Sequence, residues 1–83
     1  MDNILDIKIE LHNKAIKGIL NSYKKYKFNI YLFILSDNFN HIEKYIDKLS
    51  DKITLTNDIS NLYENAYKFG YMCGKIFYIK NEQ

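Results

Sequence analysis

The chain lacks four residue types entirely, and these absences narrow what the protein can be. Arg, Pro, Trp and Val do not occur, and Cys occurs once, as Cys73. A single cysteine excludes an internal disulfide framework and is compatible with a reducing compartment. The 83 residues suffice for one small domain and are too few for a large enzyme with a deep cofactor cleft.

Long apolar runs are missing as well. The longest one extends from Phe28 to Leu35 and is interrupted by Asn29, whereas a membrane-spanning helix needs about 20 apolar residues. Met1-Asp2-Asn3 is unlike the start of a secretory signal. We therefore expect no membrane partner and a cytoplasmic location. Ile, Lys, Asn and Tyr, whose codons are AT-rich, supply 43 of the 83 residues, which indicates a low-GC bacterium or a cell infected by an AT-rich virus or phage.

What the chain does have is apolar residues at helical spacing. Three series with alternating steps of four and three residues predict helices over about 3–26, 29–51 and 57–79, with a break in the second at 36–38. A phase change near 24–29 predicts a chain reversal or a kink. The stripe that we expect the first helix to bury is Leu5, Ile9, His12, Ile16, Ile19, Tyr23 and Tyr26. The pattern predicts an all-α fold, a small antiparallel bundle of three or four helices in a single domain of residues 1–83.

Two segments leave a mixed α/β fold open. Residues 28–35 and 75–79 are rich in strand-forming side chains, and Gly74 precedes the second segment. Without proline, helix starts are only weakly marked. Thr56 is predicted to cap the last helix, with Asp58 in its first turn, and residues 36–38 are predicted to cap a helix that begins at Phe39.

Residue types that carry enzyme or metal chemistry are few and scattered. His12, His41 and Cys73 are not at ligand spacing, and a zinc site needs three or four ligands. Three carboxylates share one helix face, but a lysine follows each of them, which indicates a solvated charged surface. These carboxylates are Glu43, Asp47 and Asp51. We expect no catalytic residue, no metal, no cofactor and no enzymatic activity.

Lysines gather in the first helix and its end, interleaved with aromatic residues. The predicted basic patch is Lys14, Lys17, Lys24, Lys25 and Lys27, and Asn21 continues its stripe. The patch is either a solvated face, a surface for an acidic protein, or a nucleic-acid site in which lysines meet phosphates and aromatic rings stack on bases. The absence of Arg, the residue favoured for guanine recognition, and the net charge of only +2 weigh against nucleic acid.

The last helix carries small residues at every fourth position, at Ala66, Gly70 and Gly74. A glycine inside a helix costs about 1 kcal/mol relative to alanine, and a close helix–helix contact gives a reason for two of them. That contact lies either inside the chain, which we favour, or in a homodimer or a partner complex. Tyrosines, which are enriched at interfaces, flank the stripe. The predicted interface is Tyr63, Tyr67, Gly70, Tyr71, Gly74 and Tyr78.

The function expected from these features is that of a small non-enzymatic protein–protein interaction module. Its size, composition and lack of recognisable chemistry are typical of regulators or inhibitors carried by phages, plasmids and other mobile genetic elements. Such a protein acts by occluding a surface, for example on a host defence complex. Another protein is thus the expected partner, with a homodimer next. The alternative is a small nucleic-acid-binding regulator that uses the basic first helix.

Overall fold

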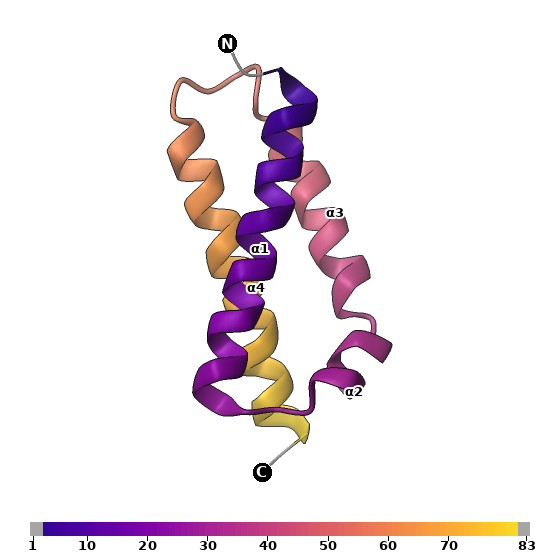
Figure 1. The fold of residues 1–83 in the computed structure, drawn as a ribbon. Coiled ribbons are helices and arrows are strands. Elements are labelled where there is room, and N and C mark those ends of the chain that lie inside the picture. Colours follow the sequence, from indigo (N-terminus) through magenta and orange to yellow (C-terminus); the bar gives the residue numbers. More distant parts are fainter. Residues whose placement is uncertain (1–2, 82–83) are drawn as a thin grey trace.

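The computed structural model describes residues 3–81, which form four helices and no strand (Figure 1). The helices are α1 (Ile4–Tyr26), α2 (Ile30–Leu35), α3 (Asn38–Ser50) and α4 (Ile59–Asn81). The all-α prediction is confirmed. The α/β alternative is wrong, because residues 30–35 form α2 and residues 75–79 lie within α4. None of these helices combines the length and the apolar character needed to cross a bilayer.

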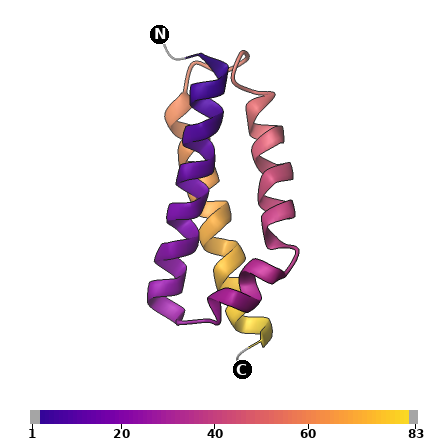
Figure 2. The ribbon, with the colours of Figure 1, turned by 45° about the vertical axis from the view of Figure 1, so that its right-hand side comes forward.

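The long helices form a bundle in which α3 runs antiparallel to both α1 and α4 (Figures 1 and 2). α1 and α4 are therefore parallel to each other, as the first and third long helices of an up-down-up bundle must be. α2 forms the corner at one end, and residues 51–58 cross the other end. Most contacts between helices are those of α1 with α4.

A local hydrogen bond of a backbone amide marks each end of α1. The Asn3 side-chain oxygen accepts a hydrogen bond from the Asp6 amide at 2.8 Å, and Asp6 adds negative charge in the first turn. At the other end Lys27 adopts the left-handed conformation, with φ of 57°, and its amide donates to the Tyr23 carbonyl at 2.7 Å. The chain reversal predicted near 24–29 is located at this residue.

The break predicted at 36–38 separates α2 from α3. Asn29 caps α2, because its side-chain oxygen accepts from the Leu32 amide at 3.1 Å. The Ser36 hydroxyl donates to the Phe33 carbonyl where α2 ends. α3 then begins at Asn38, one residue before the predicted start, and the side chain of the preceding residue, Asp37, caps no backbone amide.

The predicted cap of α4 is displaced by two residues. Asp58, and not Thr56, precedes the first residue of α4, and its carboxylate accepts a hydrogen bond from the Asn61 amide at 3.1 Å. The Thr56 hydroxyl accepts from the Asp58 amide at 3.0 Å and so orders the approach to the cap. Both residues carry short oxygen-bearing side chains, and the carboxylate occupies the capping position.

Three phenylalanines form an aromatic core at the end that holds α2. Ring centroids lie 5.3 Å apart for Phe28 and Phe33, 5.7 Å apart for Phe28 and Phe77, and 5.4 Å apart for Phe33 and Phe77. All three side chains are buried. Leu11 of α1 and Ile46 of α3, both fully buried, extend this core along the bundle.

The predicted buried stripe of α1 is wrong in its first half, whereas the predicted Ile19 is buried and Tyr23 and Tyr26 are half-buried against the core. Leu5, Ile9 and Ile16 are 64%, 50% and 46% exposed. The residues that α1 buries are Ile7, Leu11, Ala15, Gly18, Ile19 and Ser22, of which only Ile19 was predicted. The reason is the fit to α4, because three of these residues are small and let the backbones of the two helices approach. Leu5, Ile9 and Ile16 of the predicted stripe stay at the surface.

Candidate binding surface

α1 and α4 meet along a seam of small residues. The seam consists of Ala15, Gly18 and Ser22 on α1 and Gly70 and Gly74 on α4. A methyl group added at Gly70 would overlap the Ala15 carbonyl, and one added at Gly18 would lie 2.7 Å from the Tyr71 amide nitrogen. Backbone atoms cannot move away by a change of rotamer, as a side chain can. Gly70 and Gly74, which we placed in the predicted interface, are therefore occupied by a contact inside the chain.

A row of tyrosines follows the seam on α4. Tyr63, Tyr67, Tyr71 and Tyr78 are all half-buried. The row reaches α1 at Tyr26, whose ring stacks on that of Tyr78 with centroids 5.0 Å apart, and the rings of Tyr67 and Tyr71 lie 6.4 Å apart. Burial, together with a hydrogen bond to Tyr26, raises the pKa of Tyr71.

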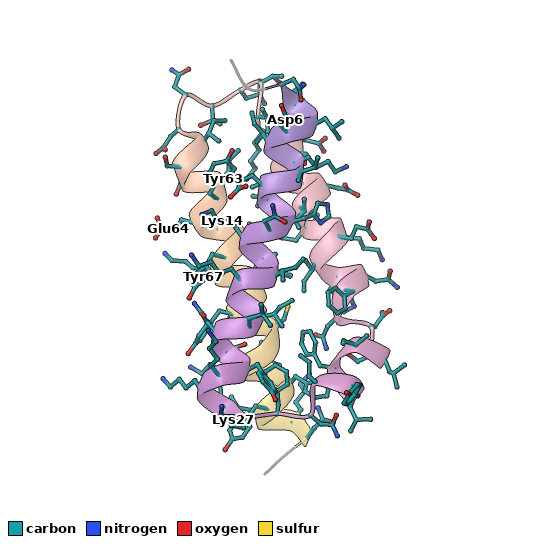
Figure 3. All side chains as sticks on the ribbon, viewed as in Figure 1. Asp6, Lys14, Lys27, Tyr63, Glu64 and Tyr67 are labelled. Carbon is teal, nitrogen blue, oxygen red and sulfur yellow. The ribbon has the colours of Figure 1, made fainter. Side chains whose placement is uncertain are left out.

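Beside two of these tyrosines lies a hollow of about 570 Å³ between α1 and α4. Its lining residues are Lys14, Lys17, Asn21, Ser60, Tyr63, Glu64 and Tyr67. Figure 3 shows Lys14 close to Tyr63 and Tyr67, with Glu64 on the outer side. The Asn21 amide donates a hydrogen bond to the Tyr67 hydroxyl at 2.7 Å, which holds that ring against α1.

The charges around the hollow favour an anionic group. Glu64 accepts a hydrogen bond from Lys68 at 2.8 Å, which lowers the pKa of Glu64 and engages its charge. Lys14 lies 3.7 Å from Glu10, and Lys17 is exposed and forms no salt bridge with any residue between 3 and 81. Two lysines with neighbouring hydroxyl and amide groups can bind a carboxylate or a phosphate through charge-assisted hydrogen bonds.

The other three lysines of the predicted patch lie elsewhere. Lys25 is 5.4 Å from the centroid of the Tyr26 ring, and Lys27 is 5.8 Å from that of Tyr23. Figure 3 shows Lys27 at the end of α1, far from Lys14. Lys24 is exposed. The fold thus brings only the first two lysines of the patch to the hollow.

The histidines and the cysteine are spread over two further hollows. His41 pairs with Asp37 at 3.2 Å at the start of α3. Cys73 lines a groove of about 640 Å³ between α3 and α4, and burial alone raises its pKa to about 11. At neutral pH it is a thiol and not the reactive thiolate. His12 lines the other of these two hollows, between α1 and α3. Within residues 3–81 no three His, Cys, Asp or Glu side chains gather around a common metal position.

Of the three carboxylates predicted to share a helix face, Glu43 and Asp47 lie on α3 and Asp51 follows its last residue. Asp47 lies 2.9 Å from Lys8 and so joins α3 to α1. This hydrogen bond raises the pKa of Lys8. Both side chains are partly exposed, so the contact is a surface bridge between helices and adds no group to the hollow.

Several residues of the seam and the hollow were not among the predicted site residues, and these are Ala15, Gly18, Asn21, Ser22, Ser60 and Glu64. Gly18 completes the seam, and it is recognisable in the sequence because Ala15, Gly18 and Ser22 recur at helical spacing like the small residues of α4. Ser60 lines the hollow, and no local pattern distinguishes it from other polar residues near a helix start.

In comparisons with protein family models, with curated proteins and with solved structures, the chain matches none of them.

Proposed function

We propose that the protein is a non-enzymatic binding module that occupies an acidic surface of another protein through the α1–α4 hollow and the tyrosine row. The observation that carries the proposal is the hollow itself, where Lys14 and Lys17 of α1 lie beside Tyr67 of α4. The lysines bind partner carboxylates, and the tyrosines supply apolar area with a polar tip. In this role the chain acts as a regulator or inhibitor by occlusion, of the kind that phages and plasmids carry.

Three features favour a protein over a nucleic acid as the partner. The tyrosine rings are half-buried and stack on one another, so their faces are less available to bases. Of the five lysines in the predicted patch, only Lys14 and Lys17 line the hollow, so the hollow holds no continuous track of lysines for a phosphate backbone. The chain also has no Arg and a net charge of only +2.

A nucleic-acid-binding regulator is the second candidate, and one observation favours it. Residues 11–36 contain five lysines and no acidic residue, so the C-terminal half of α1 has a positive field. Binding of this kind loses affinity steeply with salt, because neutralised phosphates release their counterions. A salt titration of the complex therefore separates the two candidates.

The test is an affinity purification from cells that encode the protein, with three tagged forms. These are the wild type, Lys14→Glu/Lys17→Glu in the hollow, and Lys44→Glu/Lys52→Glu at exposed positions elsewhere. The two variants change the net charge equally. We expect a protein that the wild type and the second variant retain and the hollow variant loses. Loss from both variants, retention by all three forms, or recovery of nucleic acid alone contradicts the proposal.

A further inference from the structure

α1 keeps four large apolar side chains of one stripe at the surface. Leu5, Ile9, Ile16 and Leu20 are 64%, 50%, 46% and 48% exposed. Steps of four, seven and four residues place them on one stripe about 22 Å long. Phe39 of α3 is 40% exposed and shares a hollow with Ile16, so the apolar surface continues onto α3. A stripe of this length is typical of a helix that packs against another helix.

The spacing of this stripe is the same in both directions along the helix. If two α1 helices lie antiparallel about a twofold axis near residues 12 and 13, Leu5 of one copy lies opposite Leu20 of the other. Ile9 then lies opposite Ile16. Every apolar position of the stripe meets an apolar position, as a self-complementary twofold contact requires.

The charges beside the stripe have the same symmetry. Asp6 and Glu10 flank its N-terminal half, and Lys17 and Lys24 flank its C-terminal half on the same side. In the antiparallel twofold pair, this flank of one copy lies against the same flank of the other copy, which runs in the opposite direction. Lys17 of one copy therefore comes within one turn of Glu10 of the other. Within residues 3–81, neither Lys17 nor Lys24 forms a salt bridge. In a parallel pair this flank would instead face the opposite flank of the partner helix, so that Lys17 and Glu10 would not meet.

From this stripe and its charged flank we infer that the protein forms an antiparallel homodimer through α1. The second copy covers the four apolar side chains and pairs opposite charges at both ends of the contact. The dimer surface is separate from the α1–α4 seam, and only Lys17 lies at the border between the stripe and the hollow. The four apolar residues of the stripe do not line the hollow, so the dimer can be tested on the isolated chain without the partner proposed above.

Sedimentation equilibrium of the full chain tests the dimer. We expect a dimer for the wild type, and for Ile9→Glu and Ile16→Glu a dissociation constant raised at least about 100-fold, because each variant buries two unpaired charges. Helix content should be unchanged, because both residues are half-exposed in the single chain. Leu55→Glu, at a position that is 85% exposed outside the stripe, should dimerise like the wild type. A monomeric wild type, or a dimer that survives Ile16→Glu, overturns the inference.

Charge reversal tests the orientation. Glu10→Lys and Lys17→Glu should each weaken the dimer, because each opposes like charges across an antiparallel contact. The two changes combined in one chain should restore it. Unchanged dimerisation of the single variants, or no recovery in the double variant, excludes the antiparallel pairing.

Cross-linking locates the twofold axis. In a Cys73→Ala background, Asn13→Cys should form a disulfide between copies, because residue 13 lies beside the axis. Leu5→Cys should not, because two copies of residue 5 are about 22 Å apart in this arrangement. A disulfide through position 5, or none through position 13, contradicts the proposed register.

Discussion

Lys27 has the only positive φ among residues 3–81, at 57°. A residue with a Cβ is strained by about 1–2 kcal/mol in this region, whereas glycine is not. We expect Lys27→Gly to raise the free energy of unfolding by about 0.5–1 kcal/mol, after the greater freedom of glycine in the unfolded chain is subtracted. Lys24→Gly, inside the last turn of α1, is the matched control and should lower it by about 1 kcal/mol. Urea titration measures both, and a destabilised Lys27→Gly would contradict the account.

At the scale of the elements, the α1–α4 seam decides which substitutions the bundle tolerates. A methyl group at Gly74 would overlap the Ser22 hydroxyl and lie 3.0 Å from a ring carbon of Phe28. We expect Gly74→Ala to destabilise the fold by about 1–3 kcal/mol, although alanine is the better helix former. In a Ser22→Gly background the loss should be smaller, because the main obstacle is then absent. Thermal melts of the double-mutant cycle give the coupling.

Gly70 provides the control for this cycle. Its obstacle is the backbone of Ala15, which no side-chain change removes, so the loss caused by Gly70→Ala should persist in an Ala15→Gly background. Recovery there, or a Gly74→Ala variant as stable as the wild type, would show that α1 and α4 can move apart without loss.

At the scale of the whole molecule, α3 is held less firmly than the other long helices. Hollows of about 640 Å³ and 150 Å³ lie on its two sides. Its contacts with α1 and α4 include the buried Ile42, Ile46 and Leu49, the Tyr45 ring stacked on that of Phe69 with centroids 4.2 Å apart, and the exposed bridge from Asp47 to Lys8. Local opening begins where buried contacts are few. We expect the amide hydrogens of α3 to exchange faster than those in the middle of α1 and α4, as measured by NMR hydrogen exchange. Equal protection in all three helices would indicate one cooperative unit instead.

The sequence alone determined the helical class, the approximate ends of the long helices and the break between α2 and α3. These features depend on neighbours within one or two turns, through apolar periodicity and the short polar side chains at residues 36–38. The same local evidence placed Lys14 and Lys17 on one stripe of α1 and the tyrosines on one side of α4.

Only the tertiary structure decided which stripe of α1 is buried and which lysines meet the tyrosines. α1 has two apolar stripes, one through Leu5 and Ile9 and one through Ile7 and Leu11. The first continues into Ile16 and the second into Ala15 and Gly18, so apolar periodicity alone favours burial of the first. The bundle instead buries the stripe that contains Gly18, because close packing against the glycines of α4 depends on the shape of a helix about 50 residues further along the chain. Since α1 and α4 run parallel, this choice also brings Lys14 beside Tyr67 and leaves Leu5 and Ile9 at the surface.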